Sequence, residues 1–195
     1  QLVLTGALND IGSPIFTNSG KSYRVGLEVE SVIAITDKLI LNPNITLSQN
    51  KNQDFYFERD GVLANLGNTS IAYSPDVIVG NRITFLPVKD FQISLLSKYV
   101  GEQFMGNIDS NYSKLDAYFV NDLNVSYDWK INKGLKSVTF SALVNNLFNL
   151  EYESNGYFYT YDDDWSTPGS ISTVEGKGLY PQAGINFLAG VALKF

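Results

Sequence analysis

The last eleven residues of the chain alternate between apolar side chains and small or polar ones. Phe187, Ala189, Val191, Leu193 and Phe195 share one face of this segment, because successive side chains of a β-strand point to opposite sides. The opposite face is small or polar apart from one leucine. An apolar stripe that ends on an aromatic residue is typical of a strand whose outer face contacts lipid, with the aromatic residue at the membrane boundary.

The same alternation recurs along most of the chain. The alternating segments are 23–35, 39–48, 77–85, 91–99, 117–129 and 138–145. Short turns are expected near 36–38, 88–90 and 131–136, and long loops near 9–21, 51–73, 104–114 and 153–183. With the two ends of the chain this makes eight strands of about ten residues, long enough to cross a bilayer when tilted. Short turns on one side and long loops on the other are typical of an outer-membrane barrel.

The polar face of these strands carries many Asn, Ser and Thr residues together with charges. The charged residues are Arg24, Glu28, Glu30, Arg82, Lys98, Asp122 and Asp128. Burying them in a packed soluble core would be strongly unfavourable, whereas a water-filled lumen accepts them. A soluble antiparallel sheet with one solvated face is the alternative.

Aromatic residues cluster where the strands meet the short turns. They are Phe85, Phe91, Tyr127, Trp129 and Phe195. Aromatic girdles of this kind mark the membrane interfaces of a barrel, whereas packing in a core would scatter the rings. The sequence therefore predicts an all-β fold, a transmembrane antiparallel up-and-down β-barrel.

Composition excludes several kinds of site. The 195 residues contain no cysteine and no histidine. Disulfides, zinc–thiolate sites and thiol catalysis are thereby excluded, and the usual general base and commonest metal ligand are absent. The net charge of −6 and the pI near 4.6 argue against a nucleic-acid partner, which needs clustered Lys and Arg. No apolar run predicts a transmembrane helix, and no signal-peptide pattern is present, so we expect a mature or truncated segment.

Five segments carry motifs that, taken together, resemble a known family. They are Lys21–Glu28, Tyr99–Phe104, Lys114–Leu123, Val144–Asn149 and Tyr180–Gly184 running into the terminal Phe195. They resemble the C-terminal barrel region of TonB-dependent outer-membrane receptors, of the kind found in Bacteroidetes-type bacteria.

The resemblance implies a transport protein without a cofactor in the outer membrane of a Gram-negative bacterium. Such receptors are 22-stranded barrels with an N-terminal plug, and they import scarce nutrients with energy delivered by TonB. Residues 1–195 would then be the last eight or so strands, with the plug and the TonB box outside this chain. The partners implied are the TonB complex through the missing N-terminal part, outer-membrane lipid and lipopolysaccharide, and the barrel-assembly machinery through the strand that ends at Phe195. Ferric siderophore, haem, cobalamin and oligosaccharide all fit as cargo.

Two long loops hold the candidate ligand-binding residues. They are Phe55, Tyr56, Phe57 and Arg59 in one loop, and Tyr157, Tyr159, Tyr161 and Trp165 in the other. Their rings could stack on a sugar, a macrocycle or a siderophore, and Asp162, Asp163 and Asp164 could bind a divalent ion. The alternative is that these loops simply pack on their neighbours.

Three smaller features give further expectations. Glu28 and Glu30 could form a cation site or a proton-sharing pair, or could be a lumen-wall or plug-facing charge pair balanced by Arg24 or Arg82. Pro43 lies in the middle of a predicted strand and lacks a donor, so we expect a bulge there. Three asparagines, Asn145, Asn146 and Asn149, are expected to pair with backbone where a strand bends.

Other functions stay open at this point. A free-standing eight-stranded barrel would have a structural or adhesion role, and its interior would be filled by side chains. An outer-membrane enzyme is disfavoured, because hydrolases of this kind usually transfer a proton with histidine. A soluble β-sandwich that binds a ligand is the remaining alternative.

Overall fold

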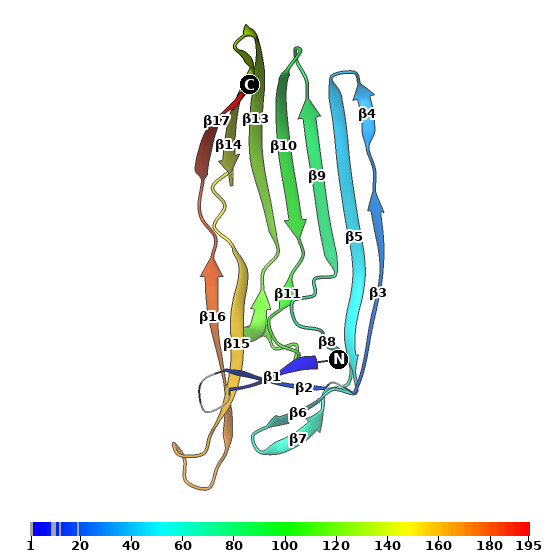
Figure 1. Cartoon of the computed structure of the whole chain (residues 1–195). Helices are drawn as coiled ribbons and strands as arrows, with labels where there is room; N and C mark the ends of the chain where they lie inside the picture. Colours follow the sequence, from blue (N-terminus) through cyan, green and yellow to red (C-terminus); the bar gives the residue numbers. More distant parts are fainter. Residues whose placement is uncertain (1, 9–10, 12, 19) are drawn as a thin grey trace.

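The chain folds into one long antiparallel sheet with a group of short hairpins at one end, in a computed structural model that describes residues 2–8, 11, 13–18 and 20–195 (Figure 1). The long sheet contains β3 (Lys21–Glu30), β4 (Ile33–Thr36), β5 (Leu39–Gln53), β9 (Val77–Phe85), β10 (Phe91–Val100), β13 (Tyr118–Lys133), β14 (Leu135–Asn145) and β17 (Asn186–Lys194). The remaining elements are β1 (Leu2–Leu8), β2 (Pro14–Asn18), β6 (Tyr56–Arg59), β7 (Val62–Asn65), β8 (Thr69–Ser70), β11 (Gln103–Phe104), η1 (Asn111–Ser113), β12 (Lys114–Leu115), β15 (Glu153–Asp163) and β16 (Ser172–Pro181).

The strand order is that of a meander. It runs β17-β14-β13-β10-β9-β5-β3, and β4 and the short β8 also pair with β5. Chain neighbours joined by short turns are sheet neighbours, as expected for an up-and-down barrel wall. The segment counted from the sequence as the first strand of the wall does not join it, because β1 pairs with β2 in a separate two-stranded sheet.

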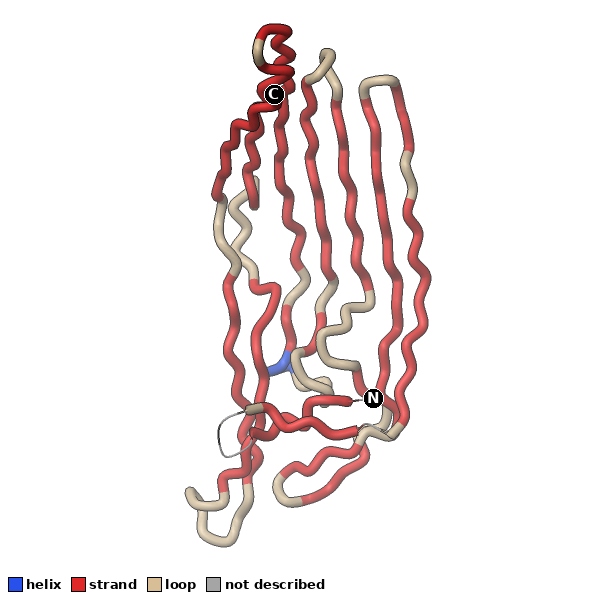
Figure 2. Tube along the Cα trace, in the orientation of Figure 1, coloured by secondary structure: helices blue, strands red, loops and turns tan. Residues whose placement is uncertain are grey.

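The short turns and the long loops lie at opposite ends of the sheet. The turns between β4 and β5, β9 and β10, and β13 and β14 share one end, while β6–β7, β11–β12 and the long β15–β16 hairpin lie at the other (Figure 2). This arrangement confirms the expectation from sequence. Within the described residues no helix is long and apolar enough to span a membrane.

Pairing between strands gathers the alternating residues onto two faces. Ile45 is opposite Val79, Leu95 is opposite Ile83 and Leu123, and the same face continues through β14 to β17. We call this the apolar face. Many of its large side chains are exposed, among them Val25, Leu27, Phe85, Phe119, Trp129, Phe140, Phe187, Val191 and Leu193.

An exposed apolar face of this extent decides between lipid and a soluble core. The buried hydrophobic residues are few, and most belong to the loop end: Phe55, Phe57, Ile71, Val100, Met105, Leu115 and Val138. Soluble monomers rarely expose contiguous apolar patches larger than a few hundred Å². The apolar face therefore fits a lipid-facing surface, as the alternation predicts.

The opposite face, which we call the polar face, carries the charges expected of a lumen wall. Arg82 is opposite Asn42 and Leu96, and Leu96 is opposite Asp122. Arg24, on the same face, donates to the Asn50 and Ser74 side chains at 3.1 Å.

The pair Glu28 and Glu30 lies on this polar face, opposite Thr46 and Asn44. Arg24, one of the arginines expected to balance the pair, is bonded elsewhere, and the described residues contain no ion pair to either carboxylate. The described residues also contain no group of three metal-ligating side chains, so a cation site has no geometric support here.

The bulge expected at Pro43 is absent. Pro43 is opposite Asn81, and the pairing of β5 with β9 keeps one register from Leu39 to Leu47. The N–H that Pro43 lacks would have pointed to the strand on the other side of β5. That strand is interrupted beside Pro43, since β3 ends at Glu30 and β4 begins at Ile33. Ser31 still donates its N–H to the Pro43 carbonyl at 3.1 Å, so the break is local. The lost hydrogen bond thus interrupts the strand beside the proline and leaves the register intact.

Candidate functional site

The loops at one end of the sheet form a connected mouth in which the β6–β7 hairpin reaches the β15–β16 hairpin. Arg59 forms an ion pair with Glu175, and Glu175 also accepts the Ser110 hydroxyl. Asp60 and Thr173 exchange two hydrogen bonds of 2.7 Å, one in each direction. Because these partners are more than sixty residues apart along the chain, only the folded loops can bring them together.

A short segment, residues 105–113, lies on the polar-face side of the sheet and contacts the β15–β16 hairpin. Asn107 Oδ1 accepts hydrogen bonds from the Ala72 N–H at 2.9 Å and from the fully buried Asn52 amide on β5 at 3.4 Å. Met105 is buried, and the Ser110 side chain caps η1 by accepting from the Tyr112 N–H. The segment therefore packs against the polar face of the sheet at the end of β5.

Three of the four candidate residues in the first loop have structural contacts. Phe55 and Phe57 are both buried and pack with Ile108 in a small cluster. Arg59 lies over the Phe57 ring at 5.8 Å and is held by Glu175. Tyr56, whose chain neighbours Phe55 and Phe57 are buried, is itself exposed.

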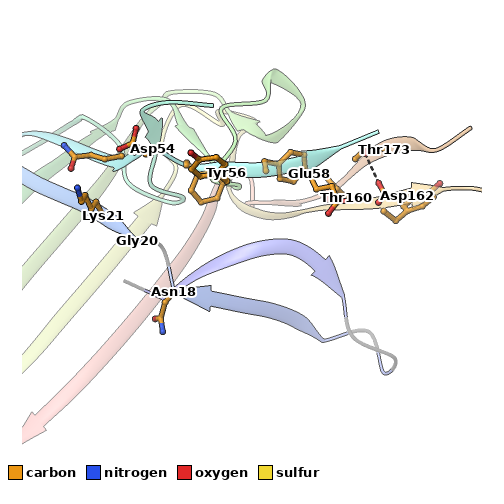
Figure 3. A pocket seen from close by; sticks show the side chains of 13 residues that line it. Asn18, Gly20, Lys21, Asp54, Tyr56, Glu58, Thr160, Asp162 and Thr173 are labelled. Atoms are coloured by element: carbon orange, nitrogen blue, oxygen red, sulfur yellow. Dashed lines mark hydrogen bonds between the residues drawn. The ribbon is translucent and has the colours of Figure 1, made fainter. Parts of the chain in front are cut away.

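A cavity of about 690 Å³ lies beside Tyr56 at the mouth (Figure 3). Its lining comes from three parts of the chain: Asn18, Gly20 and Lys21; residues 53–58; and Thr160, Tyr161, Asp162 and Thr173. Tyr56 supplies an exposed ring, and Lys21 a positive charge among the acidic Asp54, Glu58 and Asp162. A mixed aromatic and charged wall suits a polar ligand with flat groups.

The aromatic residues of the longest loop form a row. Tyr157, Tyr159, Tyr161 and Trp165 follow one another with ring centroids 6.2, 6.4 and 6.0 Å apart and nearly parallel planes. Tyr180 joins the row at 6.0 Å from Tyr157. We call these five rings the tyrosine ladder. Side chains alternate along β15, so the ladder lies on the face opposite Thr160 and Asp162.

The three consecutive aspartates of this loop do not form a cluster. Asp162 accepts the Thr173 hydroxyl at 2.7 Å, and Asp163 accepts the N–H groups of Trp165 and Ser166. The Ser166 hydrogen bonds are the main cause that lowers the pKa of the Asp163 carboxyl. No group of three metal-ligating side chains occurs in the described parts of the chain.

The girdle residues all lie at the short-turn end. Phe85, Tyr127, Trp129 and Phe195 are exposed, and Phe91 packs edge-to-face on Tyr127 with the centroids 6.2 Å apart. The structure thus groups them as the sequence suggested, while their contact with a membrane boundary stays a prediction.

The asparagine-rich corner is structural, as expected. The Asn146 side chain donates to the Leu150 and Ala183 carbonyls and accepts the Leu150 N–H, and Asn149 Oδ1 accepts the Ile185 N–H at 2.8 Å. Both residues adopt positive φ, which asparagine tolerates. Asn145 differs, because its amide donates to the Asn186 side chain.

Sequence reasoning did not find the residues that connect the loops. Asp60, Ser110, Thr173 and Glu175 carry no motif, since each is an ordinary polar loop residue until the fold pairs it. Gly176 and Gly178 were a usable signal. Two glycines spaced by two in a strand indicate a close approach, and here the rings of Tyr159 and Tyr157 lie over them.

Residues 2–147 match the family model described as TonB dependent receptor-like, beta-barrel. The chain belongs to this TonB-dependent receptor family. Members of the family are transport receptors of the Gram-negative outer membrane, not enzymes. No curated protein matches the chain.

Several solved receptor structures share the fold. The closed form of the ferric-catecholate import receptor Fiu from K12 E. coli has a TM-score of 0.61 and 18% identity over 96% of this chain. The siderophore receptor PiuA from Acinetobacter baumannii has a TM-score of 0.60 and 16% identity over 95%. The ferric yersiniabactin uptake receptor FyuA from Yersinia pestis has a TM-score of 0.56 and 15% identity over 93%. The chain spans 23% to 25% of these receptors' lengths.

Proposed function

We propose that this chain is part of the barrel of an outer-membrane receptor that imports a ferric siderophore with energy from TonB. The observation that carries the proposal is a family barrel wall whose loops enclose a cavity of about 690 Å³. The structural neighbours suggest the cargo class, because all three are named for the import of iron or of a siderophore. Haem, cobalamin and oligosaccharide are less favoured cargoes, since no neighbour reported above is named for them.

In this proposal the loops capture the ligand and covalent chemistry plays no part. The Tyr56 ring and the Lys21 ammonium line the cavity and are the contacts we assign to the siderophore, with Tyr161 at its rim. The Lys21 ammonium pairs with an anionic group of the iron complex, and the Tyr56 ring stacks on its flat groups. The plug then moves under force from TonB, and the ligand is released on the periplasmic side.

Both edges of the wall require further strands. The path of the sheet begins at β17 and ends at β3, and within the described residues no pairing joins the two. Unpaired backbone groups facing hydrocarbon cost several kcal/mol each. We therefore place this chain as the C-terminal portion of a larger barrel whose plug and TonB box lie elsewhere. A free-standing barrel of this chain alone would have to join these two edges.

The partners follow from this placement. The apolar face contacts outer-membrane lipid and lipopolysaccharide, with the girdle of Phe85, Phe91, Tyr127, Trp129 and Phe195 at the periplasmic boundary. The strand that ends at Phe195 is the segment we assign to the barrel-assembly machinery. The TonB complex binds through the remainder of the receptor.

The test is uptake of radioactive iron by cells that carry the full-length receptor. Cells supplied with a ferric siderophore under iron limitation should accumulate iron only when both the receptor and TonB are present. Tyr56→Ala should weaken siderophore binding about tenfold, as expected for one lost stacking contact. Tyr112→Ala removes an equally exposed tyrosine outside the cavity lining and serves as the control. Equal uptake without TonB, or growth that is indifferent to iron, would contradict the proposal.

A further inference from the structure

The tyrosine ladder is a continuous strip of five aromatic rings. Tyr157, Tyr161, Trp165 and Tyr180 are all exposed. Neighbouring planes within the Tyr157–Trp165 row differ by only 7° to 20°. Exposed aromatic residues normally scatter, so an aligned row of this length indicates a binding strip.

Two glycines build the strip. Tyr157 is opposite Gly178 and Tyr159 is opposite Gly176 on the paired strand. A Cβ at either glycine would collide with the facing tyrosine ring. The rings can therefore lean across the neighbouring strand only because these two positions have no side chain.

The ladder faces away from the mouth. The other side of the hairpin packs on the lumen segment: a Cβ on Gly156 would meet the Met105 sulfur at 2.7 Å, and one on Gly106 would meet the Phe158 ring at 2.6 Å. That segment lies on the polar-face side, as the hydrogen bond from Asn52 to Asn107 shows. The ladder consequently lies on the same side as the apolar face, outside the barrel wall.

The position of the ladder along the wall excludes hydrocarbon as its occupant. β15–β16 continues the line of β14 and β17 beyond the loop end (Figure 1). The two glycines lie roughly eight to ten residues beyond β17, which at about 3.3 Å per residue and a tilt of about 40° is roughly 20 Å. An apolar band is only about 25 Å tall, and β17 with its nine residues already spans it. The ladder thus lies in the layer of sugars above the lipid.

The charge of the strip selects among the molecules in that layer. The ladder side of the hairpin comprises Asn155, Tyr157, Tyr159, Tyr161 and Asp163 on β15 and Ser172, Val174, Gly176, Gly178 and Tyr180 on β16. It has no Lys or Arg, since Lys177 points to the other side, 5.2 Å from the Tyr112 ring. Phosphate binding would require cations. Ring faces attract the C–H groups of a sugar instead.

We propose that the tyrosine ladder binds the uncharged sugar residues of the glycolipid in the outer leaflet. This rests on the outer-membrane placement in the proposed function, but assigns the Tyr157, Tyr159 and Trp165 rings to the membrane surface and not to the imported ligand, while Tyr161 also lines the cavity. Successive rings at 6.0–6.4 Å match the order of size of one sugar unit, so neighbouring sugars can stack on neighbouring rings. The ladder thereby anchors the long hairpin in the sugar layer.

Purified full-length receptor tests this with two probes. The first is the oligosaccharide released from the lipopolysaccharide of the producing strain by removing its lipid. The second is vesicles of phosphatidylethanolamine and phosphatidylglycerol without glycolipid. The oligosaccharide should bind the wild type, and Tyr157→Thr/Tyr159→Thr/Trp165→Thr should weaken it at least about tenfold, as expected for three lost ring contacts. Equal binding to the triple Thr variant, or equal binding of glycan-free vesicles, overturns the proposal.

Two further variants guard against a misfolded hairpin. Phenylalanine at the same three positions keeps the ring faces and should retain binding to within about threefold. Gly178→Ala keeps every ring but displaces Tyr157, and should weaken binding several-fold. Gly190→Ala on β17, where a Cβ would meet the Ser141 hydroxyl at 2.9 Å, is the control and should change nothing. A triple Phe variant as weak as the triple Thr variant would overturn the stacking role.

The same variants separate this proposal from iron uptake. The triple Thr variant should import the ferric siderophore normally, while Tyr56→Ala should lose siderophore binding and keep oligosaccharide binding. Loss of siderophore binding in the triple Thr variant would show that these rings contact the imported ligand, and would overturn the proposal. Binding of a secreted polysaccharide in preference to the glycolipid oligosaccharide would also overturn it.

Discussion

The strand wall and the loop mouth are both antiparallel β-structure, yet different interactions hold them. In the wall, the environment of a side chain depends only on which of the two alternating faces of its strand it occupies. The apolar face meets lipid and the polar face meets the lumen. In the mouth, the hairpins are held by a few specific contacts, such as Glu175 with Arg59 and Ser110, and by small clusters such as Phe55 with Phe57. The wall therefore tolerates any residue of the right polarity, whereas the mouth depends on particular partners.

The sharpest test of this contrast places a charge on each face of one strand. Leu95 lies on the apolar face of β10, and Leu96 lies on the polar face beside Asp122. Leu95→Arg should destabilise the full-length barrel by about 2–4 kcal/mol, because a guanidinium would enter hydrocarbon. Leu96→Arg should cost less than about 1 kcal/mol. Urea unfolding of receptor reconstituted in vesicles measures both, and equal costs would refute the assignment of the faces.

The junction between wall and mouth should be the next most sensitive point. Asn146 is 4% exposed, has positive φ and makes three hydrogen bonds to backbone. Asn146→Ala should cost about 2–3 kcal/mol, from unsatisfied backbone groups and a strained φ. Asn145→Ala, which removes one exposed hydrogen bond, should cost less than about 1 kcal/mol. The same unfolding measurement compares the two, and a smaller cost at Asn146 would show that its hydrogen bonds are dispensable.

A third prediction concerns the contacts that join the mouth hairpins, those of Glu175 with Arg59 and Ser110, which we call the latch. Glu175 is mostly buried and holds both Arg59 and Ser110, so Glu175→Ala should cost about 1–2 kcal/mol locally. Hydrogen exchange of residues 56–65 should accelerate about 5- to 30-fold while the wall strands are unchanged.

The latch prediction has a matched control in Glu102→Ala. This variant removes the more exposed ion pair to Lys114, and should leave exchange nearly unchanged. If exchange accelerated throughout the wall after Glu175→Ala, the mouth would not be an independent unit.

The smallest effect is expected from pH at the loop tip. Hydrogen bonds from Ser166 lower the pKa of Asp163, so the carboxylate supports the turn fully above its ordinary pKa and loses that support as pH falls through the lowered value. The difference in fluorescence between the wild type and Trp165→Phe should report a looser turn only in strongly acidic buffer. Asp163→Asn should remove that pH dependence, and a transition near neutral pH would contradict the assignment.

The wall could be predicted from the sequence almost residue by residue. Alternation from Tyr23 to Ile35 and from Phe187 to Phe195 assigned the faces correctly, because period two is a local property of an extended chain. The first predicted strand, which does not join the wall, is one exception, and Pro43 is another. Its missing donor was correctly identified, but the consequence fell on Ser31 and Val32 of the neighbouring strand, which sequence position alone does not reveal.

For the mouth, the sequence predicted only which kinds of residue the loops contain. The sequence identified an aromatic and acidic loop, but could not say that Phe57 is buried or that Tyr157 faces outward, since both depend on which segment packs against which side.

The sequence by itself thus determined the strands, their two faces and the family, because polarity at period two needs no distant partner. The tertiary structure alone decided the loop partners of Glu175, the burial of Phe55 and the outward direction of the tyrosine ladder. These depend on contacts between residues far apart in the chain, and the free energy of such contacts exists only once the hairpins have closed on one another.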